Sequence, residues 1–464
     1  MYRPHPEHRQ QKTSGSERSH AGEARLTAVQ QATQQRIRAV WAEAPGPATA
    51  ALGAPAFFWE HPKGGLRAAA FGETVRREGA PLRSLFAGLE EAIAWPLGAP
   101  EPPGPWFGSV AFDRTRPMGP DWAGFGCARF ILPALLCWSR GGRHFVAAFG
   151  DGCDQRLERA TAALRAHGDA HEGVAPDATM PSHAMPGQAM PGHALAQAHV
   201  VVQPGERERW SALVTRALAA IDRGELDKIV LARAIRVEAG QPIDAGALLE
   251  ALAARHPSCR TFLVRGDSGA VFLGSTPETL CRIEGSLLRT EALAGSARPG
   301  DGKALLGRQK ELREHRWVVD NIVRGLAGVA GTLQHRPEPD VRELANVAHL
   351  VTPISARLAP GRSIAEVVAA LHPTPAVAGV PTAAALRFLA LHEPLDRGLY
   401  AGLVGWIGPG RAELSVALRS ALVRGASARL FVGAGIVRGS SPDAEWAETG
   451  LKSRALLDAL GVAP

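Results

Sequence analysis

Lysine is scarce in this sequence, although positive charge is not. Lysine and arginine together account for 52 of the 464 residues, and the lysines among them are Lys12, Lys63, Lys228, Lys303, Lys310 and Lys452. An arginine side chain keeps its proton inside a protein, whereas a lysine side chain can lose its proton when it is buried or lies beside other cations. The lysine in the strand-like segment "DKIVLAR", Lys228, therefore calls for a chemical explanation.

Cysteines and long apolar runs are also few. The five cysteines are an odd number without CxxC or zinc spacing, so the sequence indicates neither a disulfide framework nor a structural metal site. Apolar runs such as residues 130–138 are far shorter than the roughly 20 residues of a membrane helix, and the N-terminus does not resemble a signal peptide. We expect a globular cytoplasmic protein.

The excess of positive charge lies mainly at the N-terminus. The net charge is +7, and residues 1–40 contribute seven Lys and Arg against three Glu. Residues 1–28 lack apolar periodicity, which predicts a disordered basic tail. Because no aromatic residues alternate with these charges, we interpret the tail as a solvated arm and not as a nucleic-acid-binding segment.

A segment rich in Met, Pro, His and Gly divides the rest of the chain. Residues 169–199 repeat a Met-Pro-x-x-Ala unit three times, a composition typical of a linker loop. This loop separates an N-terminal portion, residues 29–168, from a C-terminal portion, residues 200–464.

The C-terminal portion alternates helical patterns with runs of strands joined by short turns, which predicts an α+β fold with antiparallel sheets. We expect helices at 206–222, 243–255, 303–330, 364–371, 382–391 and 443–460, and strands at 227–237, 260–265, 270–274, 279–284, 287–290, 399–408, 413–424 and 428–435. In the N-terminal portion, "AAAFGE", "WFGSVAFD", "RFILPALLCWS" and "RHFVAAFGD" read as strands, and "LRSLFAGLEEAIAW" reads as a helix.

Acidic residues stand at unusual positions on two of the expected helices. Glu445, Glu448 and Lys452 share one face of the last helix, and Glu314 lies at the edge of an apolar stripe. Carboxylates from two helices are ligands that Mg²⁺ accepts. The alternatives are a solvated face with a Glu448–Lys452 pair, and a pair of Glu314 with a neighbouring arginine.

A series of motifs resembles the chorismate-utilising enzymes related to anthranilate synthase component I, and among them the isochorismate synthases. The motifs occur in this order: "DKIVLAR", "FLGSTPETL", "ALAGSARPG", "REHRWVVDNI", "HPTPAVAGVP", "YAGLVGW", "VALRSALV" and "GAGIVRGSSPDAEWAETGLKSRALL". The resemblance spans nearly all of residues 200–460, and "WFGSVAFD" with "FILPALL" is similar to the N-terminal half of the same family. It implies one large unit of layered antiparallel sheets flanked by helices.

The resemblance also implies a reaction, which is the reversible, Mg²⁺-dependent conversion of chorismate to isochorismate. Water adds at C2 while the C4 hydroxyl leaves, so the site needs a base and an acid. By motif match Lys228 is the base and Glu278 the acid. The metal ligands are Glu314 and Glu448, with Glu445 close by.

The same matching implies the residues that contact the substrate. They are Gly295, Ser296, His349, Ala376, Tyr400, Arg419, Gly433, Gly435 and Lys452. We expect Arg419 to lie in a strand, opposite Val416 and Leu418, and to bind a carboxylate with its fork of donors.

Two motifs distinguish this chain from relatives with other chemistry. Anthranilate and aminodeoxychorismate synthases usually carry "DLxRND" where this chain reads "VVDNIVRG", and a threonine where Ala376 stands. Amine transfer is therefore not expected. Salicylate synthases share Lys228 and Glu278, and Ala376 argues against them. The long N-terminal portion, Tyr400 and "GIVRGS" favour the menaquinone type over the siderophore type.

A hypothesis from another class is an inactive chorismate-binding protein, or one that binds nucleic acid through its tail. An inactive relative would normally lack one of Lys228, Glu278, Glu314 or Glu448, and all four are present. We expect chorismate as the small-molecule partner, no nucleic-acid or membrane partner, and a monomer or weak homodimer.

Overall fold

The computed structural model of the chain describes residues 37–172 and 198–462, with short gaps at 45–51, 62–64, 80, 87–88, 90–92, 97–99, 101 and 345–346. The predicted tail, residues 1–28, and most of the predicted linker, residues 169–199, lie outside the described residues. No helix within the described ranges combines the length and the apolar character that a membrane crossing needs.

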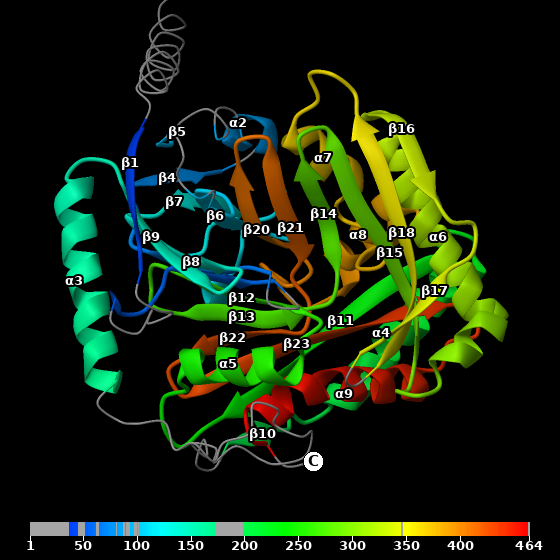
Figure 1. Cartoon of the computed structure of the whole chain (residues 1–464). Coiled ribbons are helices and arrows are strands. Elements are labelled where there is room, and N and C mark those ends of the chain that lie inside the picture. Colours follow the sequence, from blue (N-terminus) through cyan, green and yellow to red (C-terminus); the bar gives the residue numbers. More distant parts are fainter. Residues whose placement is uncertain are drawn as a thin grey trace, which may run out of the picture.

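Two large sheets dominate the described part of the chain (Figure 1). In the larger sheet the order is β10 (His199–Val201), β11 (Lys228–Glu238), β23 (Ser427–Val437), β22 (Ser420–Arg424), β13 (Val271–Thr276), β12 (Arg260–Arg265), β2 (Phe57–Glu60), β3 (Arg67–Phe71), β8 (Leu135–Arg140), β9 (Arg143–Phe149), β1 (Ile37–Glu43) and β5 (Ile93–Ala94), and β19 (Gly379–Val380) pairs with β11. In the smaller sheet the order is β16 (Ala330–His335), β18 (Ala348–Leu358), β15 (Leu287–Ala297), β14 (Thr279–Glu284), β21 (Arg411–Val416), β20 (Leu403–Gly408), β6 (Trp106–Val110), β7 (Ala128–Leu132) and β4 (Val75–Glu78), and β17 (Asp340–Glu343) pairs with β18.

Each sheet contains strands from both portions of the chain. In the larger sheet β12 pairs antiparallel with β2, and in the smaller sheet β20 pairs antiparallel with β6. The N-terminal and C-terminal portions therefore share continuous backbone hydrogen bonding in both sheets. The predicted α+β fold, one large unit of layered antiparallel sheets, is confirmed.

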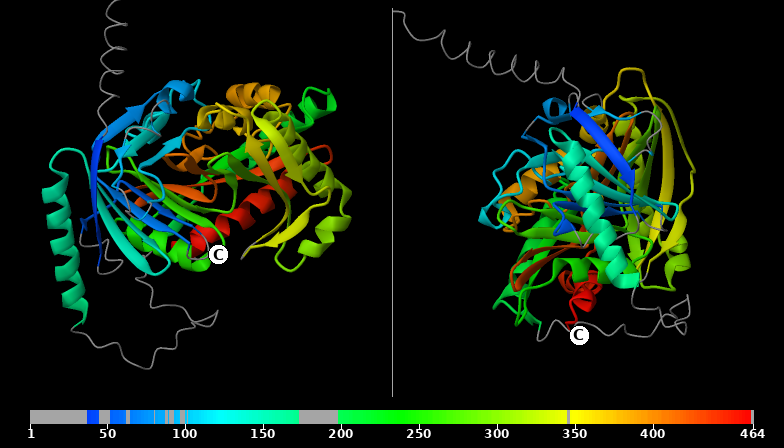
Figure 2. Two further views of the ribbon diagram at one scale, coloured as in Figure 1. Left: turned by 45° about the horizontal axis from the view of Figure 1, so that its top comes forward. Right: turned by 60° about the vertical axis from the view of Figure 1, so that its left-hand side comes forward.

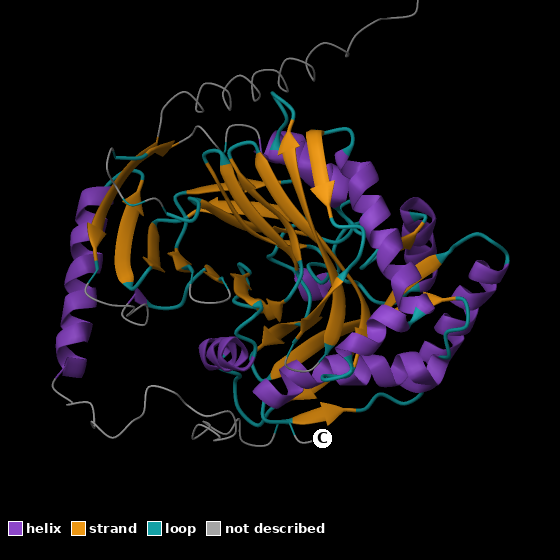
Figure 3. Cartoon of the chain, turned by 45° about the vertical axis from the view of Figure 1, so that its right-hand side comes forward, coloured by secondary structure: helices purple, strands orange, loops and turns teal. Residues whose placement is uncertain are grey.

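Helices cover the outer faces of the sheets (Figures 2 and 3). α3 packs on β1 and β9 at one end of the molecule, α5 packs on β12 and β13, α6 packs on β15, and α9 packs on β23. The helices are α2 (Leu82–Phe86), α3 (Cys153–Glu172), α4 (Glu206–Asp222), α5 (Ala245–Arg255), α6 (Gln309–Leu326), α7 (Ile364–Leu371), α8 (Thr382–His392) and α9 (Pro442–Ala459). α9 begins after Ser441, its N-cap, whose side chain accepts a hydrogen bond from the Ala444 backbone N–H.

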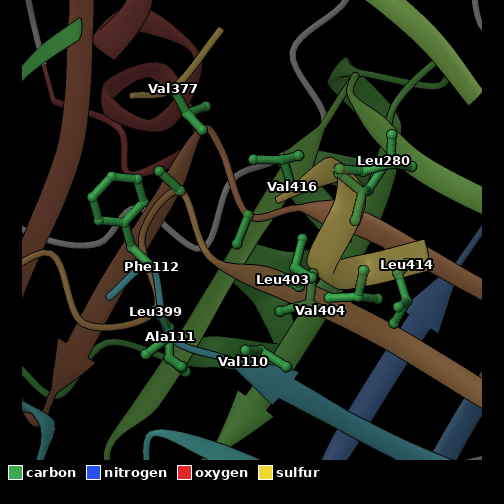
Figure 4. Close-up of a cluster of buried hydrophobic side chains, with 14 of the residues drawn as sticks. Val110, Ala111, Phe112, Leu280, Val377, Leu399, Leu403, Val404, Leu414 and Val416 are labelled. Atoms are coloured by element: carbon green, nitrogen blue, oxygen red, sulfur yellow. The ribbon is translucent and has the colours of Figure 1, made fainter. Parts of the chain in front are cut away.

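The main hydrophobic core lies between the two sheets, and Figure 4 shows part of it around Val404 and Val416. The rings of Phe57 in β2 and Phe107 in β6 meet across this core with their centroids 5.3 Å apart. A second core lies on the other face of the larger sheet. Because successive residues of a strand point to opposite faces, Phe272 packs in the main core while its neighbour Leu273 packs in the second one.

Several predicted element boundaries were wrong. The helix predicted at 303–330 begins at Gln309, after a 3₁₀ turn at Gly302–Gly307, and the strand predicted at 287–290 extends to Ala297. The sequence analysis missed α3 and also β18, which contains Pro353. A proline argues against a strand on local grounds, and the pairing of β18 with β15 overrides that signal.

The strand predicted at 413–424 is instead two strands in different sheets. β21 belongs to the smaller sheet and β22 to the larger one, and the chain crosses between them at residues 417–419. Arg419 has a positive φ of 47°, outside the extended region that non-glycine strand residues occupy. The predicted strand position of Arg419 was therefore wrong, and the arginine lies at a crossing between the sheets.

Phe272 is fully buried against Trp122 and Phe262, at centroid distances of 5.3 and 5.6 Å. Phe272→Ala should lower the free energy of unfolding by about 3–5 kcal/mol, because the cavity left behind cannot collapse fully. Urea unfolding followed by circular dichroism measures this change. Leu391→Ala is the control, because Leu391 is 77 % exposed and should change stability by less than about 0.5 kcal/mol. Equal effects of the two substitutions would contradict the assignment of the core.

Candidate active site

A cavity of about 160 Å³ opens between the two sheets, and the predicted site residues line it with one exception. The predicted residues that line it are Lys228, Glu278, Gly295, Ser296, Glu314, His349, Ala376, Tyr400, Arg419, Gly433, Gly435, Glu448 and Lys452. The exception is Glu445, which is buried on α9 beside the cavity. The structure thus brings together residues that are up to 224 positions apart in the sequence.

Two of these residues lie where the chain passes from one sheet to the other. Glu278 stands between β13 of the larger sheet and β14 of the smaller one, and Arg419 stands between β21 and β22. The crossings are joined by backbone hydrogen bonds, from the Val416 N–H to the Glu278 carbonyl and from the Ser275 N–H to the Arg419 carbonyl. The crossings thereby hold the backbones of an acid and a cation of the cavity lining close to each other.

Lys228 begins β11 and is buried, with only 1 % of its surface exposed. Its Nζ lies 2.5 Å from Oε1 of Glu314 on α6. Gly435 leaves room for this pair, because a Cβ added there would lie 3.1 Å from both Glu314 Oε1 and Lys228 Cε. The sequence analysis named burial and neighbouring cations as ways in which a lysine loses its proton; the structure shows the burial, and the neighbour is a carboxylate.

Glu278 is buried on the same cavity, and its carboxyl group departs from the ordinary charge state of a glutamate. Burial, with a smaller effect of Glu291, raises the pKa of Glu278 to about 8, although Lys228 opposes the rise. The carboxyl group is therefore mainly protonated at neutral pH. A protonated carboxyl can donate a proton to a leaving group, which matches the role of acid.

Arg419 is buried with a neutral hydrogen-bond partner. Its Nη1 lies 3.8 Å from the thiol of Cys259, and within the described residues no carboxylate lies in ion-pair distance of it. A buried guanidinium without a counter-ion is costly unless an anion binds to it. Because Arg419 lines the cavity, it marks a place for an anionic group of a ligand.

His349 in β18 is a neutral side chain beside the cavity. Burial, and secondly Arg419, lowers the pKa of His349 to about 3. Its Nδ1 lies 3.0 Å from the carbonyl oxygen of Gly295, so Nδ1 carries the proton and donates it. Nε2 is then left as an acceptor, which suits a ligand hydroxyl.

Helix α9 contributes a second ion pair to the cavity. Lys452 Nζ lies 2.7 Å from Glu448 Oε1 and 3.1 Å from the Gly433 carbonyl oxygen. Burial opposes the charge on Lys452, yet Glu448 and the neighbouring carboxylates hold its pKa above the ordinary value. The i,i+4 pair predicted as the alternative is present, and it faces the cavity instead of the solvent.

The sequence analysis missed several residues of the cavity, among them Lys310 and Glu311 on α6 and Arg397 after α8. Lys310 Nζ lies 3.9 Å from Glu445 Oε1. Rarity could have indicated Lys310, because three of the six lysines of the chain line this cavity. No local pattern identifies Arg397, which is buried in a pair with Glu393 and donates to the carbonyls of Val230 and Val377.

The carboxylates of the cavity fit Mg²⁺ as a partial ligand set. Within the described residues, no group of three His, Cys, Asp or Glu side chains is close enough to hold a metal ion. Glu314 and Glu448 nevertheless face one cavity from two helices, and Mg²⁺ commonly binds one or two carboxylates and completes its shell with water and ligand oxygens. Each of the two carboxylates is paired with a lysine here.

The cavity therefore combines three chemical capacities. Lys228 presents a buried amine, Glu278 can donate a proton, and Arg419 with Lys452 can hold anionic groups. This combination suits an acid–base reaction on a small carboxylated molecule.

Comparisons with known proteins agree with this chemistry. The model of the family described as "Chorismate binding enzyme" matches residues 24–461. The chain is 35 % identical over 427 residues to the salicylate biosynthesis isochorismate synthase of Pseudomonas aeruginosa, which covers 88 % of this chain and 85 % of that protein. It is 40 % identical over 262 residues to the isochorismate synthase MenF of Escherichia coli, and this match covers 54 % of this chain and 60 % of that protein.

Solved structures show the same architecture. The menaquinone-specific isochorismate synthase MenF from Escherichia coli superposes with a TM-score of 0.72 and 27 % identity, over 95 % of this chain and 99 % of that chain. Anthranilate synthase component I from Streptococcus pneumoniae superposes with a TM-score of 0.68 and 19 % identity, over 86 % of this chain and 93 % of that chain, which is a likeness of fold alone.

The raised pKa of Glu278 predicts a pH dependence of stability. Between pH 4.5 and about 8 the folded protein holds a proton on Glu278 that the unfolded chain has lost, so the free energy of unfolding falls as the pH rises. The fall is at most about 1.4 kcal/mol per pH unit. Glu278→Gln cannot titrate, so its stability relative to wild type should increase from pH 5 to pH 8 in urea unfolding.

The control for this prediction is Glu284→Gln. Arg282 lowers the pKa of Glu284, so Glu284 is ionised in both states over this range and its contribution should not change with pH. A pH-independent stability difference between Glu278→Gln and wild type would contradict the assignment of a protonated Glu278.

Proposed function

We propose, for a chain that belongs to the family of chorismate-binding enzymes, that the cavity around Lys228 and Glu278 converts chorismate to isochorismate. The protein is an isochorismate synthase, and thus an isomerase. The observation that carries the assignment of roles is that one cavity holds a buried lysine and a carboxyl group that is protonated at neutral pH. The two groups are the base and the acid that the reaction needs.

The reaction balances with these two groups. Lys228 takes a proton from water as its oxygen bonds to C2 of chorismate. The ring double bonds shift, and the C4 hydroxyl leaves as water with the proton of Glu278. Before it can accept a proton, Lys228 must first give up its own, which its ion pair with Glu314 opposes. Neutralisation of the negative charge of Glu314 on ligand binding would remove this opposition.

We assign the substrate carboxylates to the cations of the cavity. Arg419 offers a fork of donors and lacks a carboxylate partner within the described residues, and Lys452 stands at the other wall, on α9. The neutral His349 leaves Nε2 to accept a bond from a hydroxyl. Tyr400 is stacked on Phe431 with centroids 5.4 Å apart, which orients its hydroxyl.

We propose Mg²⁺ as the cofactor, held by Glu314 and Glu448 with Glu445 near them. The support is the chemistry of the donor set, two hard carboxylates on one cavity. Bound Mg²⁺ would supply positive charge for a substrate carboxylate and would neutralise the two glutamates. Glu445 lies close enough to Glu448 to feel its charge: burial raises the pKa of Glu445, and the charge of Glu448 adds to the rise.

Ala376 supports release of isochorismate as the product. It lines the cavity on the 372–381 loop, where the resemblance places a threonine in amine-transferring relatives and where we also expect one in salicylate synthases. Because this position lacks a hydroxyl, we propose that the reaction stops at isochorismate.

The cytoplasmic location and the monomeric or weakly dimeric state of the protein stay predictions.

We propose menaquinone formation as the use of the product. The length of the N-terminal portion, Tyr400 and "GIVRGS" support this use, as does the likeness to the menaquinone-specific MenF over 95 % of the chain. The alternative is supply of a salicylate or siderophore pathway. Its support is the 35 % identity over 88 % of the chain to a relative named for salicylate biosynthesis.

Incubation with chorismate and Mg²⁺ tests the reaction, and substitution of Lys228 tests the base. Wild type should form isochorismate without pyruvate, or anthranilate when ammonia is present, as resolved by chromatography. Lys228→Arg keeps the charge but cannot become neutral, so it should lose activity as fully as Lys228→Ala, by about 10²–10⁴. Both variants should still bind chorismate in calorimetry.

Two outcomes would overturn these assignments. Lys228→Arg within a few-fold of wild type would mean that another group activates the water. Appreciable pyruvate at neutral pH would instead identify a salicylate synthase, and it would leave the role of Lys228 intact.

Glu448→Gln tests the metal. We expect calorimetry to show weaker Mg²⁺ binding and turnover to be lost, because one of two ligating carboxylates is gone. The control is Asp458→Asn on the same helix, whose carboxylate pairs with Arg454. The Mg²⁺ assignment fails if wild type turns over equally well with excess chelator, or if Glu448→Gln binds Mg²⁺ as tightly as wild type.

A further inference from the structure

A second cavity of about 790 Å³ lies along the same strands as the active-site cavity. Its walls are α4, the middle of β11, β22, the start of β23 and the segment after α8, with Asp121 from a 3₁₀ turn. The two cavities share no lining residue. On β11, Lys228 and Val230 face the active-site cavity, and Ala232 and Ala234 face the second one.

The buried pair of Glu393 and Arg397 separates the two cavities. Glu393 accepts a hydrogen bond from the Ala232 N–H, and Arg397 donates to the Val230 carbonyl, so the pair contacts β11 between the two stretches. The pair is internally satisfied, with Arg397 Nε 2.6 Å from Glu393 Oε1. A ligand in the second cavity would therefore bind at a place separate from the active-site cavity.

Arginine dominates the lining of the second cavity. Its arginines are Arg209, Arg216, Arg233, Arg236, Arg424 and Arg429. Asp121 and Glu206 are the carboxylates of its lining within the described residues. The chain carries a net charge of only +7 over 464 residues, and the sequence analysis placed most of that excess in the N-terminal tail. The positive charge of this cavity is therefore a local concentration.

Three of these arginines already have carboxylate partners. Arg233 pairs with Glu206, Arg236 with Glu238 and Arg429 with Asp121. These pairs therefore add little net charge to the cavity.

The other three arginines contact neutral groups. Arg209 donates to the Pro204 carbonyl, Arg216 contacts the His392 ring, and Arg424 donates to the Asp121 carbonyl. No carboxylate lies in ion-pair distance of these three side chains in the described part of the chain. They are thus available for anionic groups of a ligand.

The spacing of these three arginines indicates an extended ligand. Arg209 and Arg216 are two turns apart on one face of α4, which is about 10 Å along the helix axis. Arg424 stands on a different wall, on β22. A single inorganic anion cannot span such a distance, whereas a chain of phosphates attached to an organic body can.

The cavity also has an apolar wall and the volume of a cofactor-sized molecule. Leu213, Leu395 and Leu422 line it together with Trp210, and pockets for such ligands are commonly about 300–1,000 Å³. Guanidinium groups match phosphate oxygens in pairs. We propose that this cavity binds a phosphorylated small molecule of nucleotide size, with its phosphates on Arg209, Arg216 and Arg424.

Calorimetric titration with ATP in the absence of metal tests the proposal. ATP should bind with 1:1 stoichiometry, and inorganic phosphate should bind at least about tenfold more weakly because it reaches fewer arginines. Binding should weaken with added salt. The double variant Arg209→Glu/Arg424→Glu should lose ATP binding, while its melting temperature and chorismate turnover stay at the wild-type level.

Two controls locate the site. Arg159→Glu, an exposed position on α3 at the other end of the molecule, should bind ATP like wild type. Lys452→Ala should also bind ATP like wild type, because Lys452 belongs to the active-site cavity.

Several results would overturn the proposal. They are absence of ATP binding to wild type, ATP binding that survives in the double variant, and ATP binding that is lost in Lys452→Ala. Citrate binding as tight as that of ATP would refute the choice of phosphate. Tighter, arginine-dependent binding of a single-stranded oligonucleotide would replace the small molecule with nucleic acid.

Discussion

The site depends on two crossings of the chain between the two sheets. At residues 277–278 the chain leaves the larger sheet for the smaller one, and at residues 417–419 it returns. Backbone hydrogen bonds tie the crossings to each other. Because both crossings are buried between sheets that pair residues from the two portions of the chain, Glu278 and Arg419 cannot move apart without breaking the sheets. The backbone itself therefore positions Glu278 and Arg419, which we propose as the acid and the anion-binding residue.

The charges in the cavity are balanced in pairs, and this balance prepares the site for an anionic substrate. Lys228 is paired with Glu314 and Lys452 with Glu448, whereas Arg419 has a neutral partner. Burying a charge without a counter-ion is costly. A ligand carboxylate that reaches Arg419 would supply the counter-ion and would be bound more tightly for that reason. In the same cavity burial keeps Glu278 protonated. One low-dielectric environment thus contains both a guanidinium with a neutral partner and a protonated carboxyl group.

The sequence predicted the fold class and most of the cavity because motif residues carry them. Thirteen of the fourteen site residues named from motifs line one cavity. Local patterns performed less well at boundaries. The strand predicted at 413–424 merged two strands of different sheets, because apolar residues continue on both sides of Arg419 and do not show where the chain changes sheets. β18 was missed because its proline is a local signal against a strand, and only pairing with β15 outweighs it.

The sequence by itself determined which residues are the candidates for the chemistry: rarity and the motif "DKIVLAR" single out Lys228, and the motif "GSTPETL" singles out Glu278. The tertiary structure alone decided their charge states and partners. Lys228 meets Glu314 across 86 positions of sequence, Arg397 joins the cavity without any local pattern, and six arginines from four elements converge on a second cavity. Burial and Coulomb interactions act through space, and a spacing along the chain does not encode which charges the fold brings within a few ångströms of each other.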